Sequence, residues 1–508
     1  MAIDSKRIAK NTLFLYARLL LVYGISLYSS RVILDKLGVT DYGLHGVVYG
    51  VIGMLSFLNA TLSSGTSRFI TFDLGKGELE RLKRTFSTAL YTHILLAGIV
   101  FVIAETLGLW YVHHVLVCPP ERFYAVLVIY QISIVQSVLG IIQVPFVAEV
   151  MAHERMGIYA YLGIYESLFR LLLCYVLVIT PGDRLITLSL MTLGLTVSVF
   201  FFYFLYSKKN FKEVSFKKSF DRNSFKSILA FSGWNIVANM SNTLMKQGVI
   251  MLFNLFFAPV VVAAQNISNN LSNALMQFVD GVRQAINPQV IKSYADGRYA
   301  DSKHLTLESA EYVFDLLLLM GIPMILCMPK FMSIWLVNVP EYAVIFTQLI
   351  ILQDILANFN AAFYTPMVAA NKIQKNTYAS LILCITQFGT MYVLFKLGCG
   401  PVWARLLGII FIMIWSFVVK PYILWKDLDY NWGEMIRCIL RCLRTFAFAG
   451  GLCLGVTWLI PQNSFFSMIL VAGISMMVVA TISLLFMEKS SRIKLINIFL
   501  RKFHLRKS

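Results

Sequence analysis

The chain has 508 residues, of which 58% are hydrophobic and only 14% are charged. A soluble globular domain carries about 25% charged residues, so this composition excludes an ordinary soluble domain. The apolar stretches run for roughly 20 residues, the length that a helix needs to cross a bilayer core. They lack the alternation of apolar and polar residues that marks barrel strands. The sequence therefore predicts an all-α polytopic membrane protein.

The net charge of +18 also limits the possible functions. Such a charge can indicate nucleic-acid binding. Here, however, the Lys and Arg residues lie in short segments between apolar runs, which is typical of topology signals and of contact with anionic lipids. We therefore expect membrane lipids as partners and no nucleic acid.

The apolar runs predict about fourteen spans, each long enough to cross the bilayer as a helix. In chain order they cover residues 12–34, 44–70, 86–110, 122–148, 156–179, 185–207, 227–254, 259–290, 310–334, 341–371, 375–398, 401–425, 436–460 and 464–487.

The basic residues predict how these spans are oriented. In alternating inter-span segments, 32 Lys and Arg residues fall in one set, and the other set holds only Lys36, Arg122, Arg184, Lys330 and Lys396. Cytoplasmic segments carry an excess of Lys and Arg, so the first set, which includes both termini, is expected to be cytoplasmic. The split also supports the number of spans, because one missed span would invert half of it.

No catalytic or metal-binding pattern stands out along the chain. The eight Cys residues lack the spacing of metal sites or disulfides, and we interpret them as small apolar residues that fill space between helices. His113–His114 and His153 lie in short loops, and we expect no convergent set of carboxylates beside them. A membrane enzyme usually carries a large loop with paired acids or a His, and the longest loops expected here have about 20 residues. We therefore expect no enzyme activity, no cofactor and no metal.

The sequence resembles itself in three places. PFVAEVMAHERMGIYAYL from Pro145 matches PMVAANKIQKNTYASL from Pro366, and RFITFDLGKGELERLK from Arg68 parallels PQVIKSYADGRYADSK from Pro288. KNTLFLYARLLL from Lys10 lies opposite KSILAFSGWNIV from Lys226. The three matches have nearly one offset and predict a parallel repeat, which in transporters forms two halves with a site between them.

The repeat predicts how the chain is divided into lobes. We expect a six-helix lobe at 1–207, a basic cytoplasmic linker at 208–226 and a second six-helix lobe at 227–425. Two additional helices at 426–487 and a basic cytoplasmic tail at 488–508 complete the chain.

The arrangement of six, six and two helices resembles the multidrug, oligosaccharidyl-lipid and polysaccharide exporter (MOP) superfamily, in particular its polysaccharide (Wzx-type) flippases. The resemblance rests on LDKLGVTDYGLHG (Leu34–Gly46), GKGELERLKR after the second span and PFVAEVMAHERMGIYAYL between the fourth and fifth. It implies a protein of the bacterial inner membrane that flips undecaprenyl-diphosphate-linked sugar units and works by alternating access. Other branches flip lipid II or export drugs, and those remain the alternatives.

Cations inside the predicted spans are the first candidates for a substrate site. A charge at the bilayer centre costs roughly 2.5–3.5 kcal/mol on insertion scales, so such charges usually face a partner or a wet cavity. Arg18 and Lys246 have no obvious local partner. Arg31 lies close to the outer surface, where it could snorkel, and Arg283 has Asp280 one turn away.

Amide side chains predict where sugars would bind. Asn235, Asn239, Asn242 and Lys246 share one face of the seventh expected helix, and the eighth carries a second stripe that includes Asn269, Asn273 and Gln277. Such amides can join helices across membrane interfaces. Two neighbouring stripes with charges favour a wet lumen instead, because so many amides would be costly against lipid.

Together these residues predict an anionic, lipid-linked oligosaccharide as cargo. Its diphosphate would meet Arg18, Arg31, Lys246 or Arg283, since phosphate suits Arg and Lys, and its sugars would meet the amides. Asp280 and Asp354 are candidates for coupling to H⁺ or Na⁺, and the sequence leaves ion coupling open. The chain is expected to function as a monomer.

Overall fold

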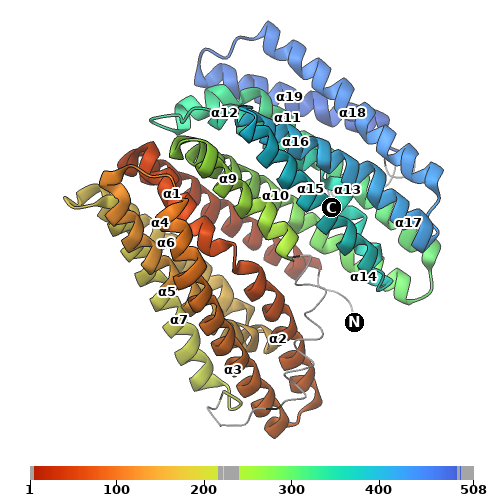
Figure 1. The fold of residues 1–508 in the computed structure, drawn as a ribbon. Coiled ribbons are helices and arrows are strands. Elements are labelled where there is room, and N and C mark those ends of the chain that lie inside the picture. Colours follow the sequence, from red (N-terminus) through yellow and green to blue (C-terminus); the bar gives the residue numbers. More distant parts are fainter. Residues whose placement is uncertain (1–4, 215–220, 222–238, 489–491, 493–508) are drawn as a thin grey trace. The chain divides into compact units, whose positions relative to one another are not determined.

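The computed structural model describes residues 5–214, 221, 239–488 and 492, and every regular element in these residues is a helix (Figure 1). The expectation of an all-α fold is confirmed. The chain divides into two compact units, Met1–Asn266 and Ile267–Ser508, and the boundary falls inside one long helix, α10 (Pro259–Ala295). The six-six-two division drawn from the sequence stays a prediction.

The first unit holds the helices before α10. They are α1 (Ser5–Gly53), α2 (Ser56–Lys76), α3 (Leu79–Ile103), the π-helical turn η1 (Ala104–Gly108), α4 (Leu109–His114), the 3-10 turn η2 (Pro120–Arg122), α5 (Phe123–Ala152), α6 (Met156–Ile179), α7 (Arg184–Asn210), the π-helical turn η3 (Leu244–Gly248) and α9 (Val249–Phe256).

The second unit holds most of α10 and the helices after it. They are α11 (Tyr299–Trp335), α12 (Ala343–Leu356), α13 (Asn358–Ala362), α14 (Tyr364–Ala369), α15 (Gln374–Lys396), α16 (Val402–Ile414), the π-helical turn η4 (Trp415–Val419), α17 (Lys420–Leu428), α18 (Trp432–Leu459) and α19 (Phe465–Phe486).

Ten helical segments of the described residues are long and apolar enough to cross a membrane. Each coincides with one of the expected spans. The four other expected spans fall on α1, on the end of α1 with α2, on a segment ending in η3 and α9, and on α10. The structure is therefore compatible with about fourteen spans. The helix α10 is long enough but is not among the ten, because its amides lower its hydropathy.

A glycine separates the first two expected spans. Gly38 breaks α1 with φ 75° and ψ 168°, a conformation that residues with a Cβ rarely adopt. The break falls between the expected spans 12–34 and 44–70, inside the segment LDKLGVTDYGLHG. This segment therefore breaks the helix where the sequence predicts a short connection between two spans.

Paired helix ends agree with the internal repeat. Gly77 and Gly297, which the repeat aligns, both adopt a left-handed conformation, with φ of 73° and 76°, just after α2 and α10. Glu154 and Asn371 follow α5 and α14, and each has φ 55°. At both of these ends, N–H groups reach back to two carbonyls of the last helical turn, the pattern of a Schellman motif. The two halves of the repeat thus end their helices in the same way.

Two glycines let α10 begin directly against α1. A Cβ on Gly43 would lie 2.0 Å from the Pro259 carbonyl oxygen, and one on Gly46 would lie 1.7 Å from Nδ2 of Asn266. Either distance is far inside van der Waals contact. Asn266, an amide of α10 that precedes Asn269 in the sequence, therefore packs against the α1 backbone and serves helix packing.

Candidate functional site

One face of α10 holds the second unit together through polar contacts. Ser272 donates to Asp354 of α12 at 2.5 Å, and Arg283 donates to Asn358 of α13 at 3.1 Å. Further along, Thr365 of α14 donates to Asn287 at 3.1 Å. The helices α12 to α14 are therefore held against α10 by side-chain hydrogen bonds at several points along its length.

The charged centre of this interface is a cluster on α10, α12 and α13. Arg283 Nη1 donates to Asp280 at 3.0 Å and Nη2 donates to Asn358, whose own Nδ2 donates to the Ala310 carbonyl at 2.7 Å. The Arg283 side chain is 12% exposed, whereas that of Asp280 is 51% exposed. Arg283 also interacts electrostatically with Asp354. The structure therefore brings together three of the expected site residues, Asp280, Arg283 and Asp354.

Arg405 of α16 joins this cluster, although the sequence had not assigned it to a site. Its guanidinium lies 6.0 Å from the ring centroid of Phe346 and interacts electrostatically with Asp354. Its Nε is buried and makes no hydrogen bond with a described residue. The sequence did show Arg405 inside an expected span, but not which carboxylate its helix would face.

A second face of α10 presents the amides of the expected stripe. Asn273 and Gln277 are exposed, and Asn269 is half-buried. The bonds described above from α10 to α12, α13 and α14 involve Ser272, Arg283 and Asn287 instead. Because exposed amides are costly against hydrocarbon, this face requires water or a polar partner if α10 crosses the membrane as the sequence predicts.

The expected residues of the seventh helix lie in the first unit. Lys246 is exposed and sits in the middle of η3, a π-helical turn of the kind that is frequent at functional sites. Asn242 is exposed and Asn239 is half-buried. Asn235 lies outside the described residues. The convergence of this stripe with the stripe on α10 stays a prediction.

The two other expected cations lie on α1. Arg31 is exposed, whereas the side chain of Arg18 lies outside the described part of the chain. Their roles as ligands for a diphosphate stay predictions.

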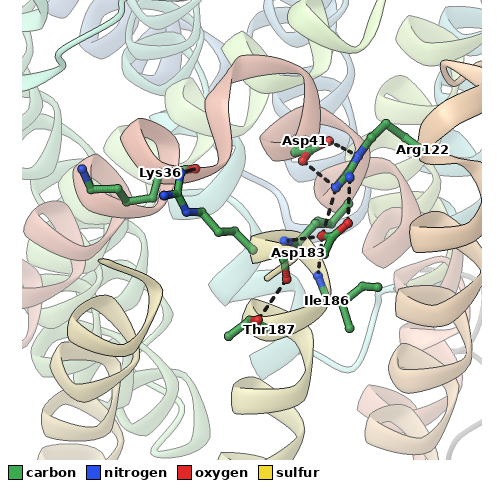
Figure 2. Close-up of polar contacts among 8 residues, drawn as sticks. Lys36, Asp41, Arg122, Asp183, Ile186 and Thr187 are labelled. Atoms are coloured by element: carbon green, nitrogen blue, oxygen red, sulfur yellow. Dashed lines mark hydrogen bonds and ion pairs between the residues drawn. The ribbon is translucent and has the colours of Figure 1, made fainter. Parts of the chain in front are cut away.

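A separate charged cluster joins three segments of the first unit (Figure 2). Arg122, at the start of α5, donates to Asp41 and to Asp183, and its shortest distance to each carboxylate is 2.7 Å. Asp183 also caps α7 by accepting from the N–H groups of Leu185 and Ile186. Arg122 is one of the five basic residues in the smaller set, which the charge pattern predicts to be periplasmic. The cluster therefore lies at the end of the unit that the charge pattern predicts to be periplasmic.

The pKa values of the two carboxylates in this cluster are shifted in opposite directions. Burial raises the pKa of Asp41, and the charge of Arg122 only partly opposes this effect. Burial also acts to raise the pKa of Asp183, but the hydrogen bonds from Arg122 and from the α7 backbone outweigh it and leave the pKa lowered. The helix cap thus distinguishes two carboxylates that share one guanidinium.

The expectation that His153 lacks convergent carboxylates is wrong. The side chains of Glu149 and Glu213 both face its imidazole. Glu149 lies on the preceding helical turn, but Glu213 is distant in sequence. Only the packing of the end of α7 against the end of α5 brings it there.

Comparisons with known proteins now bear on the fold. No protein-family profile and no curated protein matches the chain in sequence. Solved structures do match it. One is an inward-facing multidrug resistance MATE family transporter of the MOP superfamily, with TM-score 0.65 and 13% identity, covering 83% of this chain and 94% of the transporter. The chain therefore shares the fold of this transporter.

Two further structures support this assignment of the fold. The lipid II flippase MurJ, in an inward closed conformation, matches with TM-score 0.66 and 12% identity over 92% of this chain and 98% of MurJ. The MATE multidrug transporter DinF-BH matches with TM-score 0.60 and 14% identity over 82% of this chain and 94% of its own. A multi-pass membrane protein with this fold is therefore established, and its cargo is a separate question.

Proposed function

We propose that the chain transports an undecaprenyl-diphosphate-linked oligosaccharide from the cytoplasmic to the periplasmic leaflet of the bacterial inner membrane by alternating access. The product would serve the synthesis of surface polysaccharide. The observation that carries this proposal is the exposed amide face of α10, beside a charged cluster, in a fold shared with a lipid II flippase and with drug transporters. Amides suit sugar hydroxyls because each offers both a donor and an acceptor.

The charges on the helices support an anionic cargo. Lys246 and Arg31 are exposed cations, and either could meet a diphosphate. Arg283 is already bound to Asp280 and Asn358, so it would meet phosphate only by exchanging one of these partners. We therefore place the exposed Lys246 ahead of Arg283 as a ligand of the diphosphate, and Arg31 stays a further candidate.

Membrane potential would favour the proposed direction. A diphosphate carries two negative charges, and moving each outward across 100 mV, interior negative, releases about 2.3 kcal/mol. An ion could travel as well, and Asp280 and Asp354 remain the proposed coupling carboxylates.

The test is a reconstituted transport assay with the full-length protein in vesicles. A polyprenyl-diphosphate oligosaccharide with a labelled sugar would be loaded on one leaflet, and its arrival on the other measured by capture with a lectin. We expect transport by wild type, and slower transport by K246A and by the double variant N273A/Q277A. K396A is the matched control, because Lys396 is also an exposed Lys but lies at the end of α15, in the smaller of the two sets of basic residues.

The same vesicles separate the alternatives. Faster movement of lipid II than of the oligosaccharide would replace the proposal with a lipid II flippase. Efflux of a cationic dye, driven by H⁺ or Na⁺ without movement of either lipid, would replace it with an ion-coupled multidrug exporter.

A further inference from the structure

Three metal-ligating side chains converge at the end of α5 in the first unit. Glu149 lies in the last turns of α5, His153 directly follows that helix, and Glu213 follows α7. One ligand atom from each lies within 4.8 Å of the other two. His153 Nε2 is in direct contact with Glu213 Oε1 and lies 3.8 Å from Glu149 Oε2. A single nitrogen therefore faces two carboxylates from different elements.

Local structure holds the imidazole in this position. The Schellman turn after α5 places Glu154 in a left-handed conformation and ends the helix at His153. The His153 ring then stacks on Phe211, with ring centroids 4.2 Å apart and an interplanar angle of 8°. Because the ring plane is fixed on one side by Phe211, Nε2 points at the two carboxylates.

Glu149 is the second, independent sign of a ligand. Its residue is 0% exposed, and apart from the neighbouring Glu213 carboxyl neither of its carboxylate oxygens has a hydrogen-bond partner among the described residues. Within that part of the chain, the only ion-pair contact of Glu149 is the 3.8 Å one with His153. A buried carboxylate without donors is strongly unfavourable, and a second carboxylate beside it adds repulsion. A bound cation would satisfy both groups at once.

We propose that Glu149, His153 and Glu213 form a binding site for a divalent transition-metal ion of the zinc type. Imidazole nitrogen and carboxylate oxygen are ordinary zinc ligands, and zinc binds four groups. Three come from the chain, which leaves one position for water or another ligand. Calcium is a poorer match because it takes six to eight oxygen ligands. The ion would crosslink the end of α5 to the segment after α7.

This proposal does not rest on the proposed function, because metal binding is measured without any transport. Full-length protein in detergent would be stripped with a chelator and titrated with Zn²⁺ against a fluorescent competitor. Bound metal would be counted by mass spectrometry. We expect one tight equivalent in wild type. In H153A and in E213Q, we expect the affinity to fall by at least about tenfold, the smallest effect typical of losing even an indirect partner of a zinc ligand.

The matched control is H304A. His304 faces Glu308 one turn away at 3.6 Å, the same spacing as Glu149 and His153, yet no third ligand joins that pair among the described residues. H304A should bind Zn²⁺ as wild type does. A second control, H113A/H114A, removes the adjacent exposed imidazoles at the end of α4 and should also keep the tight site.

A fold check separates loss of the site from loss of structure. E149Q and E213Q keep the size of the side chain, and their gel-filtration profiles should match wild type. Addition of Zn²⁺ should raise the Tm of wild type, because an ion that binds only the folded state stabilises it, and should raise the Tm of E213Q less. Absence of a tight equivalent in wild type, or equal affinity in wild type and H153A, would overturn the proposal.

Discussion

Arg122 and Asp41 bind each other through two parallel hydrogen bonds, from Nε to Oδ1 at 2.9 Å and from Nη2 to Oδ2 at 2.7 Å. This fork joins the part of α1 after the Gly38 break to the start of α5. The third member, Asp183, extends the contact to α7 (Figure 2). One guanidinium thus sets the spacing of three helices at the end of the first unit that the charge pattern predicts to be periplasmic.

Replacing Arg122 should destabilise the first unit. R122A leaves two partly buried carboxylates side by side, and hydrogen bonds to charged groups contribute about 1.5–3 kcal/mol each where they are protected from water. We expect a lower Tm by intrinsic fluorescence in detergent and only partial rescue by R122K, because Lys lacks the planar fork. K36A is the control, since the only ion pair of Lys36 among the described residues is with its half-buried neighbour Asp35, and its loss should change stability by under about 1 kcal/mol. Equal Tm values for R122A and K36A would contradict this role.

The stability difference between wild type and D183N should depend on pH. The folded state lowers the pKa of Asp183 from its ordinary 3.8. The unfolded chain therefore binds the proton more readily, and the charged carboxylate stabilises the fold at pH values above 3.8. This contribution should be lost as the pH falls below 3.8 through the folded pKa. Thermal unfolding at several pH values measures it. The Asn side chain in D183N can still cap α7, so the variant removes the charge and keeps the cap. A stability difference that grows toward acid pH would contradict the assignment.

Gly43 should not tolerate a methyl group. G43A would place Cβ against the backbone carbonyl of Pro259, so α10 must move away from α1 at a cost of about 1–3 kcal/mol or more. G98A is the matched control, because Gly98 of α3 has open space around it and Ala favours a helix over Gly by up to about 1 kcal/mol. Thermal unfolding of both variants gives the comparison. Equal stability of G43A and wild type would show that the two helices are not held this closely.

Asp354 should matter more than Asp280 for any ion coupling. Asp354 accepts from Ser272 and lies in the field of two cations, Arg283 and Arg405, whereas the side chain of Asp280 is 51% exposed and pairs with Arg283. A bound cation or proton at Asp354 would therefore change the balance of charge in the cluster most. In vesicles with an imposed H⁺ or Na⁺ gradient, D354N should lose the gradient dependence of transport. D280N should retain it, and the reverse result would exchange the two roles.

The helical fold and most of the spans could be predicted because length and hydropathy are local properties of the sequence. The repeat aligned Gly77 with Gly297, and both do adopt the same left-handed conformation. Contacts between helices distant in sequence were harder to predict. Glu213 could not be assigned to His153, because only tertiary packing brings the end of α7 to the end of α5.

The α10 stripe illustrates the same limit. The sequence showed many amides on one helix, but their roles depend on which neighbour each one meets. Asn266 packs against Gly46 of α1, whereas Asn273 and Gln277 remain exposed. A helical period identifies a shared face, and it does not distinguish an amide that fills a gap from one that is available to a ligand.

The tight approach of α10 to α1 also constrains how this sequence can diverge. At Gly46 the Asn266 amide occupies the space of a Cβ, so a larger residue at 46 requires a smaller or reoriented one at 266. No substitution at the neighbouring position can compensate at Gly43, because its neighbour is a main-chain oxygen that every residue carries. Among related sequences, positions 46 and 266 should therefore covary, while position 43 should stay glycine.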